Sequence, residues 1–169
     1  MTTLLQLKTS LFADNSQSNQ LSDAFVERWL DAHPGGRSVT RDLAAQPVPH
    51  LDQATFQAFL TPPEARDAEQ SARAARSDEL IAELQAADVL LIGLPMYNFG
   101  VPSTLKAYFD HVARAGITFR YTEHGPQGLL SGKKAYVVAT RGGRHAGTAL
   151  DTQSAFVRHF LGFIGITEV

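Results

Sequence analysis

Hydroxyl and amide side chains crowd the segment 9–19, which separates an apolar run at residues 3–8 from a helical apolar pattern over about residues 19–32. Backbone N–H groups at a helix start attract an anion, and neutral hydroxyl and amide donors strengthen such a site. The segment holds neither Lys nor Arg, and the chain lacks the Gly-rich triphosphate and dinucleotide motifs, so a single phosphate monoester fits best. Taken alone, the segment is more typical of an ordinary capped helix. The candidate phosphate ligands are Ser10, Ser16, Gln17 and Ser18.

A second loop that could bind a ligand follows the most apolar run of the chain, residues 89–94. An uninterrupted apolar run is typical of a strand covered on both faces in a parallel sheet, and Pro95 ends it because proline has no N–H for a strand partner. Ligands of open α/β sheets bind beyond the carboxyl ends of such strands. The loop is therefore predicted to form one wall of a flat-cofactor site, with Met96, Tyr97, Asn98 and Phe99 as its residues.

A third loop follows another apolar run, Lys134 to Thr140, and contains paired glycines. Glycine lets backbone approach a ligand closely because it has no Cβ, although a Gly-Gly pair by itself usually marks a turn. Together, a phosphate seat, an aromatic wall and a glycine wall suit flavin mononucleotide (FMN). His145 is a weak candidate proton donor and is equally consistent with a solvent-facing histidine. The candidate flavin ligands of this loop are Thr140, Arg141, Gly142 and Gly143.

The elements that must position these loops are predicted from apolar spacing and capping signals. A helix is expected from Ser103 to about Ala115, with Gly116 as its C-terminal cap. Another is expected to start with Thr61 as N-cap and to run to about residue 85; its polar first half is either a solvated face or a subunit contact. In that start, Pro62 takes the first helical position and Glu64 closes a capping box. The buried face of the helix after Ser103 should contain Leu105, Tyr108, Phe109 and Val112.

The alternation of strands and helices predicts one α/β domain over residues 1–169 with a doubly wound parallel sheet. The other expected elements are a strand at 39–43, a weak helix at 52–60, an extended segment at 117–122, a glycine-rich loop at 123–132 and a helix at about 151–161.

Composition limits the class of protein. The chain has 169 residues, 44% hydrophobic and 19% charged, with a net charge of −2, which favours neither nucleic acid nor an anionic membrane as a partner. It has no cysteine, which excludes thiol chemistry, and its N-terminus does not have the pattern of a signal peptide, so a cytoplasmic location is expected. The six histidines show no metal-binding spacing, and no metal site is predicted.

Five segments resemble the FMN-dependent NADH-azoreductase and NADH:quinone oxidoreductase family along nearly the whole chain. The resemblance implies a flavodoxin-like fold with strand order 2-1-3-4-(5), a homodimer, and noncovalent FMN near the subunit interface. It also implies that the fifth strand and last helix of the family are missing after Val169, so that the chain is C-terminally incomplete. The segments are Ser16–Ser18, Met96–Phe99, Ala113–Glu123, Thr140–Gly143 and Phe160–Gly165.

The resemblance further implies a ping-pong reaction in which NADH or NADPH gives a hydride to the flavin and a quinone or azo compound then receives two electrons at the same site. Thr140 stands where the family often has serine, and Arg144 where a neutral residue is common, so substrate preference is expected to differ. For the aromatic residues, core packing is the alternative to a substrate role. The implied substrate-binding residues, some from the partner subunit, are Asn98, Phe99, Tyr121 and Phe163.

Two other functions are consistent with such a fold. The first is a flavodoxin-type electron carrier without substrate chemistry, although carriers of that type are strongly acidic and this chain is not. The second is a hydrolase or phosphodiesterase, which the absence of a G-x-S-x-G nucleophile motif and of a metal-binding histidine pattern disfavours.

Overall fold

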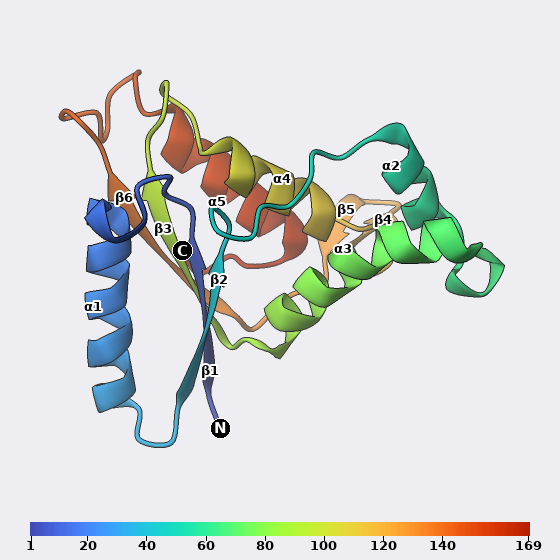
Figure 1. Cartoon of the computed structure of the whole chain (residues 1–169), viewed down its shortest axis with the longest axis horizontal. Helices are drawn as coiled ribbons and strands as arrows, with labels where there is room; N and C mark the ends of the chain where they lie inside the picture. The colour runs from blue at the N-terminus through green and yellow to red at the C-terminus, as the bar shows by residue number, and fades with distance from the viewer.

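A parallel sheet forms the centre of the structure (Figure 1). The computed structural model describes residues 1–169 apart from the side chain of Asp14. Leu5 of strand β1 (Thr3–Lys8) lies opposite Val39 on one side and Leu90 on the other. All three pairings in the sheet are parallel. The predicted order 2-1-3-4 is confirmed. In spatial order the strands are β2 (Arg37–Asp42), β1 (Thr3–Lys8), β3 (Val89–Pro95) and β6 (Lys134–Thr140).

Helices cover both faces of the sheet (Figure 1). α1 (Gln17–Ala32) lies on one face, against β1, β3 and β6. The other face is covered by the remaining long helices, and α2 (Gln53–Leu60) packs on α3 at the far end of that layer. These helices are α3 (Ala68–Ala86), α4 (Ser103–Val112) and α5 (Thr152–Ile164).

The larger part of the hydrophobic core lies between the sheet and the α3–α4–α5 layer. The predicted face of α4 is confirmed, since Leu105, Tyr108, Phe109 and Val112 are all buried. The Phe109 ring stacks on Phe160 of α5 with their centroids 3.9 Å apart. This stacking joins α4 to α5 and so fixes the two helices that follow the second and third loops.

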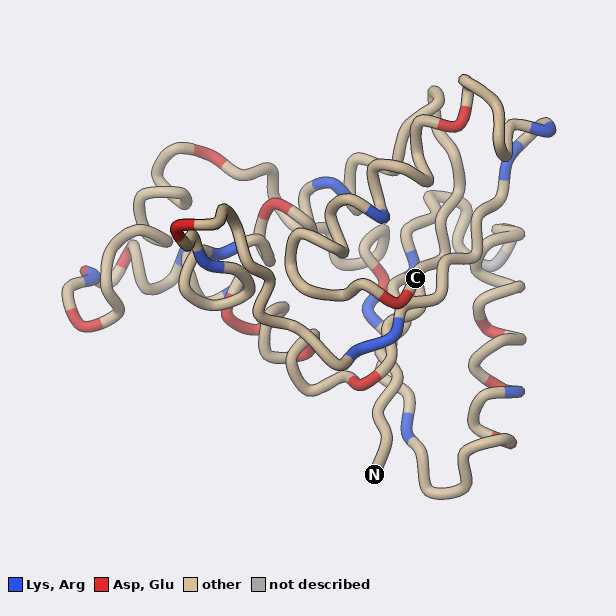
Figure 2. Tube along the Cα trace, turned by 180° about the vertical axis from the view of Figure 1, so that it is seen from behind, with Lys and Arg blue, Asp and Glu red and all other residues tan. Residues whose placement is uncertain are grey.

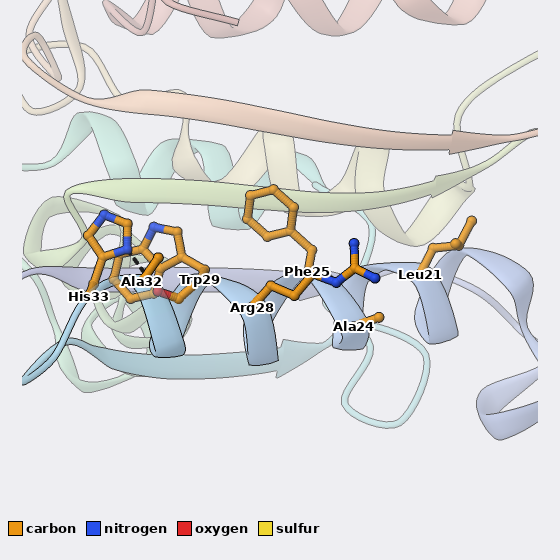
Figure 3. A pocket seen from close by; sticks show the side chains of 7 residues that line it. All are labelled: Leu21, Ala24, Phe25, Arg28, Trp29, Ala32 and His33. Carbon is orange, nitrogen blue, oxygen red and sulfur yellow. Dashed lines mark hydrogen bonds between the residues drawn. The ribbon is translucent and has the colours of Figure 1, made fainter.

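The smaller core, on the α1 side, is built around Trp29, Leu4 and Leu91. Figure 3 shows Phe25 and Trp29 directed from α1 toward the sheet, with His33 stacked on the indole of Trp29 at 4.3 Å between ring centroids. Gly93 of β3 lets α1 lie close, because a Cβ there would be 3.3 Å from the carbonyl oxygen of Ser18. The start of α1 is thereby held against the end of β3.

The predicted start of α3 is wrong. The hydroxyl of Thr61 donates to the Gln57 carbonyl and closes α2, so it does not cap a new helix. The residues after it, including Pro62 and Glu64, form only a short 3-10 turn, η2 (Pro63–Ala65). α3 begins after Asp67, whose side chain accepts from the backbone of Gln70 while the Gln70 side chain accepts from Asp67 N. This reciprocal capping box, and not the predicted N-cap at Thr61, starts the helix.

The region after α4 also differs from expectation. α4 ends at Val112, and Gly116, with φ +81°, lies in the following turn without acting as its cap. The Thr118 hydroxyl donates to the Val112 carbonyl and accepts from Arg114 N, which closes that turn. The predicted glycine-rich loop contains a strand, because β4 (Phe119–Thr122) and β5 (Gly125–Gly128) form a separate antiparallel hairpin.

The last helix is longer than predicted, since α5 reaches Ile164 and ends at Gly165, whose φ of +105° suits glycine alone. Beyond it, Ala135 N donates to the carbonyl of Glu168, on the outer side of β6. The bridge between Lys134 and Glu168 is parallel, so the last residues lie where the predicted order places a fifth strand.

The distribution of charged residues and the hydropathy of the helices bear on possible nucleic-acid and membrane partners. Figure 2 shows acidic and basic residues interspersed along the trace, without a long stretch of one sign. Among the helices of the described structure, none is long and apolar enough to cross a membrane.

The contact between β5 and the end of α5 allows a stability test. A Cβ on Gly128 would lie 2.1 Å from the Gly165 nitrogen, so Gly128→Ala must displace backbone. We expect a loss of about 1–3 kcal/mol in the free energy of unfolding, or more, measured by urea denaturation.

Gly162→Ala in α5 is the matched control. Its Cβ would meet no heavy atom of the described residues within 4 Å, so helix propensity should dominate and stability should rise by about 0.5–1 kcal/mol. Equal stability of the two variants would contradict the close packing of β5 on α5.

Candidate active site

The three loops singled out in the sequence meet at one edge of the sheet, at the upper end of β1, β3 and β6 in Figure 1. Parallel pairing makes this necessary, because the carboxyl ends of all three strands lie on the same side. A cavity of about 250 Å³ opens between them. Its lining residues are Ser10, Phe12, Asn15, Ser16, Gln17, Pro95, Met96, Tyr97, Thr140, Arg141 and Gly142.

A second cavity, of about 560 Å³, adjoins the first and shares Phe12, Met96 and Tyr97 with it. It adds Asn98 and the approach to α4. Together the two cavities have the size of a cofactor site and combine a polar end with an aromatic one. The other residues of the second cavity are Leu11, Val101, Pro102, Ser103 and Thr104.

The polar end is the start of α1. Ser16 is its N-cap, and its side chain accepts from Asn19 N at 3.2 Å. The first helical backbone bond runs from Gln20 N to Ser16 O, so the N–H groups of Gln17 and Ser18 stay outside the helical pattern and are available to an anion. The Ser18 hydroxyl is buried 3.0 Å from that of Ser16 and does not line either cavity.

Tyr97 links the first loop to the second. Its hydroxyl oxygen lies 3.1 Å from the Ser10 hydroxyl and accepts from Leu11 N at 3.1 Å. Ser10 is buried and also accepts from Phe12 N, so in this structure its hydroxyl holds the loop together. The two loops therefore form one connected wall.

The loop after β3 is strained at its tip. Asn98 and Phe99 have φ values of +51° and +66°, a left-handed conformation that costs a non-glycine residue about 1–3 kcal/mol. Tyr97 and Gly100 exchange backbone hydrogen bonds of 3.2 and 3.0 Å around them. Phe99 is exposed, and its ring meets His145 edge-to-face at 6.3 Å. Neither ring lines the two cavities.

The loop after β6 is tied to α5 through Arg141. Its guanidinium donates to Asp151 Oδ1 and to the Ser154 hydroxyl, both at 2.8 Å. The side chains of Arg141 and Asp151 are each only 10% exposed. The Ser154 backbone N–H, the Ser154 hydroxyl and Arg141 together lower the pKa of Asp151 below its ordinary value. Arg141 is thus turned from the α1 end of the cavity toward α5.

Several polar atoms at this edge are buried without a partner in the described structure. Arg141 Nε and His145 Nδ1 are both of this kind. Buried polar groups are nearly always hydrogen-bonded, so an orphaned guanidinium N–H beside a cavity indicates room for an acceptor on a bound molecule. With a helix start and neutral donors at one end and glycine and aromatic walls at the other, these residues fit a flat ring carrying one phosphate group.

A different hollow, of about 450 Å³, runs along α1 and is drawn in Figure 3. It is lined by one helix alone, with Phe25, Arg28 and Trp29 among its residues, and by none of the strand-end loops. Because it brings no donors from different elements to one point, it does not have the character of the functional site.

Comparison with known proteins agrees with this geometry. A family model described as the flavodoxin-like fold matches residues 2–169. The chain belongs to this flavodoxin-like family. It is 56% identical, over all of its length and 85% of the relative's, to a protein of Cellvibrio japonicus named FMN-dependent NADH:quinone oxidoreductase. The family resemblance inferred from the motifs is confirmed.

Two solved structures of the same fold carry the comparison further. The azoreductase from Bacillus anthracis strain Sterne is 29% identical, with a TM-score of 0.90 over 99% of this chain and 83% of that one. The FMN-dependent NADH-azoreductase from strain Ames Ancestor, solved in complex with FMN, is 25% identical, with a TM-score of 0.89 over 99% and 84%.

The flavodoxin-like chain does not bring every predicted site residue to its cavities. Tyr121 is 75% exposed on β4, with its ring centroid 5.5 Å from that of Phe119. The Phe163 ring also packs on Phe119, with a centroid distance of 4.3 Å. Neither lines the cavity of this chain, and their substrate role stays a prediction that needs a second copy. Gly143, predicted as a flavin ligand, does not line either cavity.

Other residues at the site were missed by sequence reasoning. Phe12 and Asn15 line the first cavity from the segment 9–19, whose predicted ligands do not include them. Asp151 and Ser154 hold Arg141, yet in the sequence their spacing signals nothing more than a helix start.

The ion pair between Arg141 and Asp151 predicts a pH dependence. A carboxyl whose pKa is lowered on folding stabilises the fold fully above its ordinary value, here 3.8, and loses that contribution as the pH falls through the lower folded value. Asp151→Asn keeps a capping oxygen without the charge. The stability difference from wild type, measured by urea denaturation, should be constant near neutral pH and shrink in acid.

Asp31→Asn, at an exposed position of α1, is the control for the general loss of a negative charge. If the difference between wild type and Asp151→Asn stays constant down to about pH 2, the Asp151 carboxylate does not contribute as described.

Proposed function

We propose that this chain is an FMN-dependent oxidoreductase that takes a hydride from NADH or NADPH and passes two electrons to quinones and aromatic azo compounds. The observation that carries the proposal is the convergence of three strand-end loops on a cavity with an anion-attracting helix start at one end. The names of the relatives, NADH:quinone oxidoreductase and azoreductase, support the same chemistry. Bound FMN supplies reversible hydride and electron transfer, which protein side chains cannot.

The phosphate end of the cofactor is assigned to the start of α1. Ser16 and Gln17 line the cavity there, and the free N–H groups of the first turn add the positive end of the helix dipole. Ser10 and Ser18 support this seat through their bonds to Tyr97 and Ser16. Neutral donors suffice for one phosphate group because the helix start supplies part of the positive potential.

The ring end is assigned to the second and third loops. Backbone at Gly142 and the orphaned Nε of Arg141 would offer hydrogen-bond donors to a bound ring and stabilise negative charge on it. Tyr97 and Phe12 line both cavities and offer aromatic surface to a flat ring. The proton-donor role of His145 stays a prediction, since its ring meets Phe99 and lines neither cavity.

One substrate face used in turn by NADH and by the acceptor gives a ping-pong reaction. Asn98 lines the second cavity, and the exposed Phe99 offers a flat surface beside it. We assign Tyr121 and Phe163 to the corresponding face of a partner subunit, since neither reaches the cavity of its own chain.

A substitution at the helix start tests the function. Gln17→Glu puts a negative charge at the first position of α1, where it favours the helix dipole but repels a phosphate group. We expect FMN affinity, measured by fluorescence titration, to fall roughly 10- to 100-fold while the thermal midpoint is kept. Gln53→Glu makes the same change at the first position of α2, away from the site, and should leave affinity unchanged.

Steady-state kinetics of the wild-type protein test the proposed reaction. Wild type should oxidise NADH with a quinone as acceptor, and plots at several quinone concentrations should give the parallel lines of a ping-pong scheme. FMN binding without turnover would favour an electron carrier. Failure of the wild-type protein to bind FMN would overturn the proposal.

The homodimer is a separate proposal. Phe99 and Leu150, in the loops after β3 and β6, and Phe156 of α5 are exposed, and exposed apolar surface of this kind is what a subunit contact would bury. Sedimentation velocity should give twice the chain mass of 18.4 kDa. Phe156→Glu should shift the protein toward monomer, whereas Phe56→Glu, at an exposed phenylalanine of α2, should not. A wild-type monomer would contradict the proposal.

A further inference from the structure

Gln153, in the first turn of α5, reaches both ends of the loop after β3. Its side-chain Nε2 donates to the Pro95 carbonyl at 2.8 Å and to the Gly100 carbonyl at 3.1 Å. Pro95 is the last residue of β3, and Gly100 closes the loop. Gln153 is only 1% exposed, so these bonds are shielded from water. One amide group thus fixes the separation between the beginning and the end of the loop.

The orientation of the Gln153 amide follows from its surroundings. Reversing the amide would place its oxygen against two carbonyl oxygens, which cannot donate. With Nε2 facing the carbonyls, Oε1 is buried and has no hydrogen-bond partner among the described residues. Leaving that oxygen unpaired costs free energy, which the two donated hydrogen bonds offset.

The loop held by Gln153 needs such support. Asn98 and Phe99, between its two ends, have positive φ values, and strained backbone persists only where the surroundings fix it. The neighbouring Thr152 also donates from its hydroxyl to the Phe99 carbonyl at 2.5 Å. The bonds from α5 therefore reach the loop at Pro95, Phe99 and Gly100.

The same helical turn holds the loop after β6, through Asp151 and Ser154 on Arg141. The four residues Asp151–Ser154 line neither of the two cavities at the site. They bond to the loops after β3 and β6 from outside these two cavities. In this way they hold the aromatic loop and the glycine loop in one relative position.

We propose that Gln153 is a positioning residue that fixes the Met96–Phe99 loop in the conformation that receives the flavin ring. The proposal rests on the proposed function for its ligand, but the geometry concerns the chain alone. Gln153 lines neither of the two cavities assigned to the cofactor, although it lines a neighbouring cavity of about 490 Å³ that shares Val101 and Ser103 with the second of them. Its effect on the flavin ring is therefore exerted through the loop that it holds.

Two substitutions close to glutamine in size distinguish the effect of the Gln153 hydrogen bonds from the effect of its packing. Gln153→Met removes the donor, and we expect FMN affinity to fall about tenfold, corresponding to about 1.4 kcal/mol. In Gln153→Glu, an ionised carboxylate would face the carbonyls of Pro95 and Gly100, and the affinity should fall further at alkaline pH. A protonated carboxyl can donate one bond, so affinity should recover partly as the pH falls from about 8 to about 5, whereas Gln153→Met should show no recovery.

All affinities are compared with wild type at the same pH, so that titration of the FMN phosphate cancels. Gln85→Met, at an exposed glutamine near the end of α3, is the control and should bind FMN like wild type. If Gln153→Met does not fold, Thr152→Val tests the same loop from an exposed position and should weaken FMN binding, with Thr152→Ser restoring it. Unchanged affinity in folded variants at both positions would overturn the proposal.

Amide hydrogen exchange of the FMN-free protein separates this proposal from the proposed function. The N–H groups of Met96, Tyr97 and Gly100 are bonded within the site, and Gln153→Met should speed their exchange while leaving the amides of α1 unchanged. Wild type that binds no FMN would refute the function and leave this test intact. Unaltered exchange at those three amides would refute the positioning role.

Discussion

Parallel pairing of β1, β3 and β6 is the constraint on which the rest of the structure depends. Leu7 lies beside Ile92, and Pro95 beside Thr140, so the strands end together at one edge. The loops that follow these strands must therefore begin at the same edge of the sheet. One cavity is thereby lined by three loops: a run of hydroxyls, an aromatic turn and a glycine pair. More than 40 residues of chain separate each of these loops from the next.

The walls are then fixed by bonds that run between elements. Tyr97 joins the first loop to the second, and the first turn of α5 joins the second to the third through Gln153 and Asp151. The strain at Asn98 is carried by these contacts and by the α4–α5 packing behind them. Affinity for a flat ligand depends on such preorganisation, because every loop ordered in advance removes an entropic cost of binding.

Much of the fold could be predicted because its signals are local. The apolar runs of β1, β3 and β6 and the apolar face of α4 were visible as patterns of period and length. Where two local signals competed, the prediction failed: Thr61 and Asp67 both offer a cap, and only the backbone around them decides that Thr61 closes α2. The hairpin at β4–β5 was missed because its second strand, Gly125–Gly128, has the composition of a turn.

The sequence by itself determined which elements form, which loops lie at the strand ends, and the kinds of donor they carry. It also showed the family, since the motifs stand at matching positions along the chain. Only the tertiary structure decided that Arg141 turns to Asp151, that Tyr121 and Phe163 lie away from the cavity, and that Gln153 holds a loop more than 50 residues earlier. The reason is physical: periodicity is a property of neighbouring residues, whereas a side chain's partner depends on how the crossovers bring distant segments together.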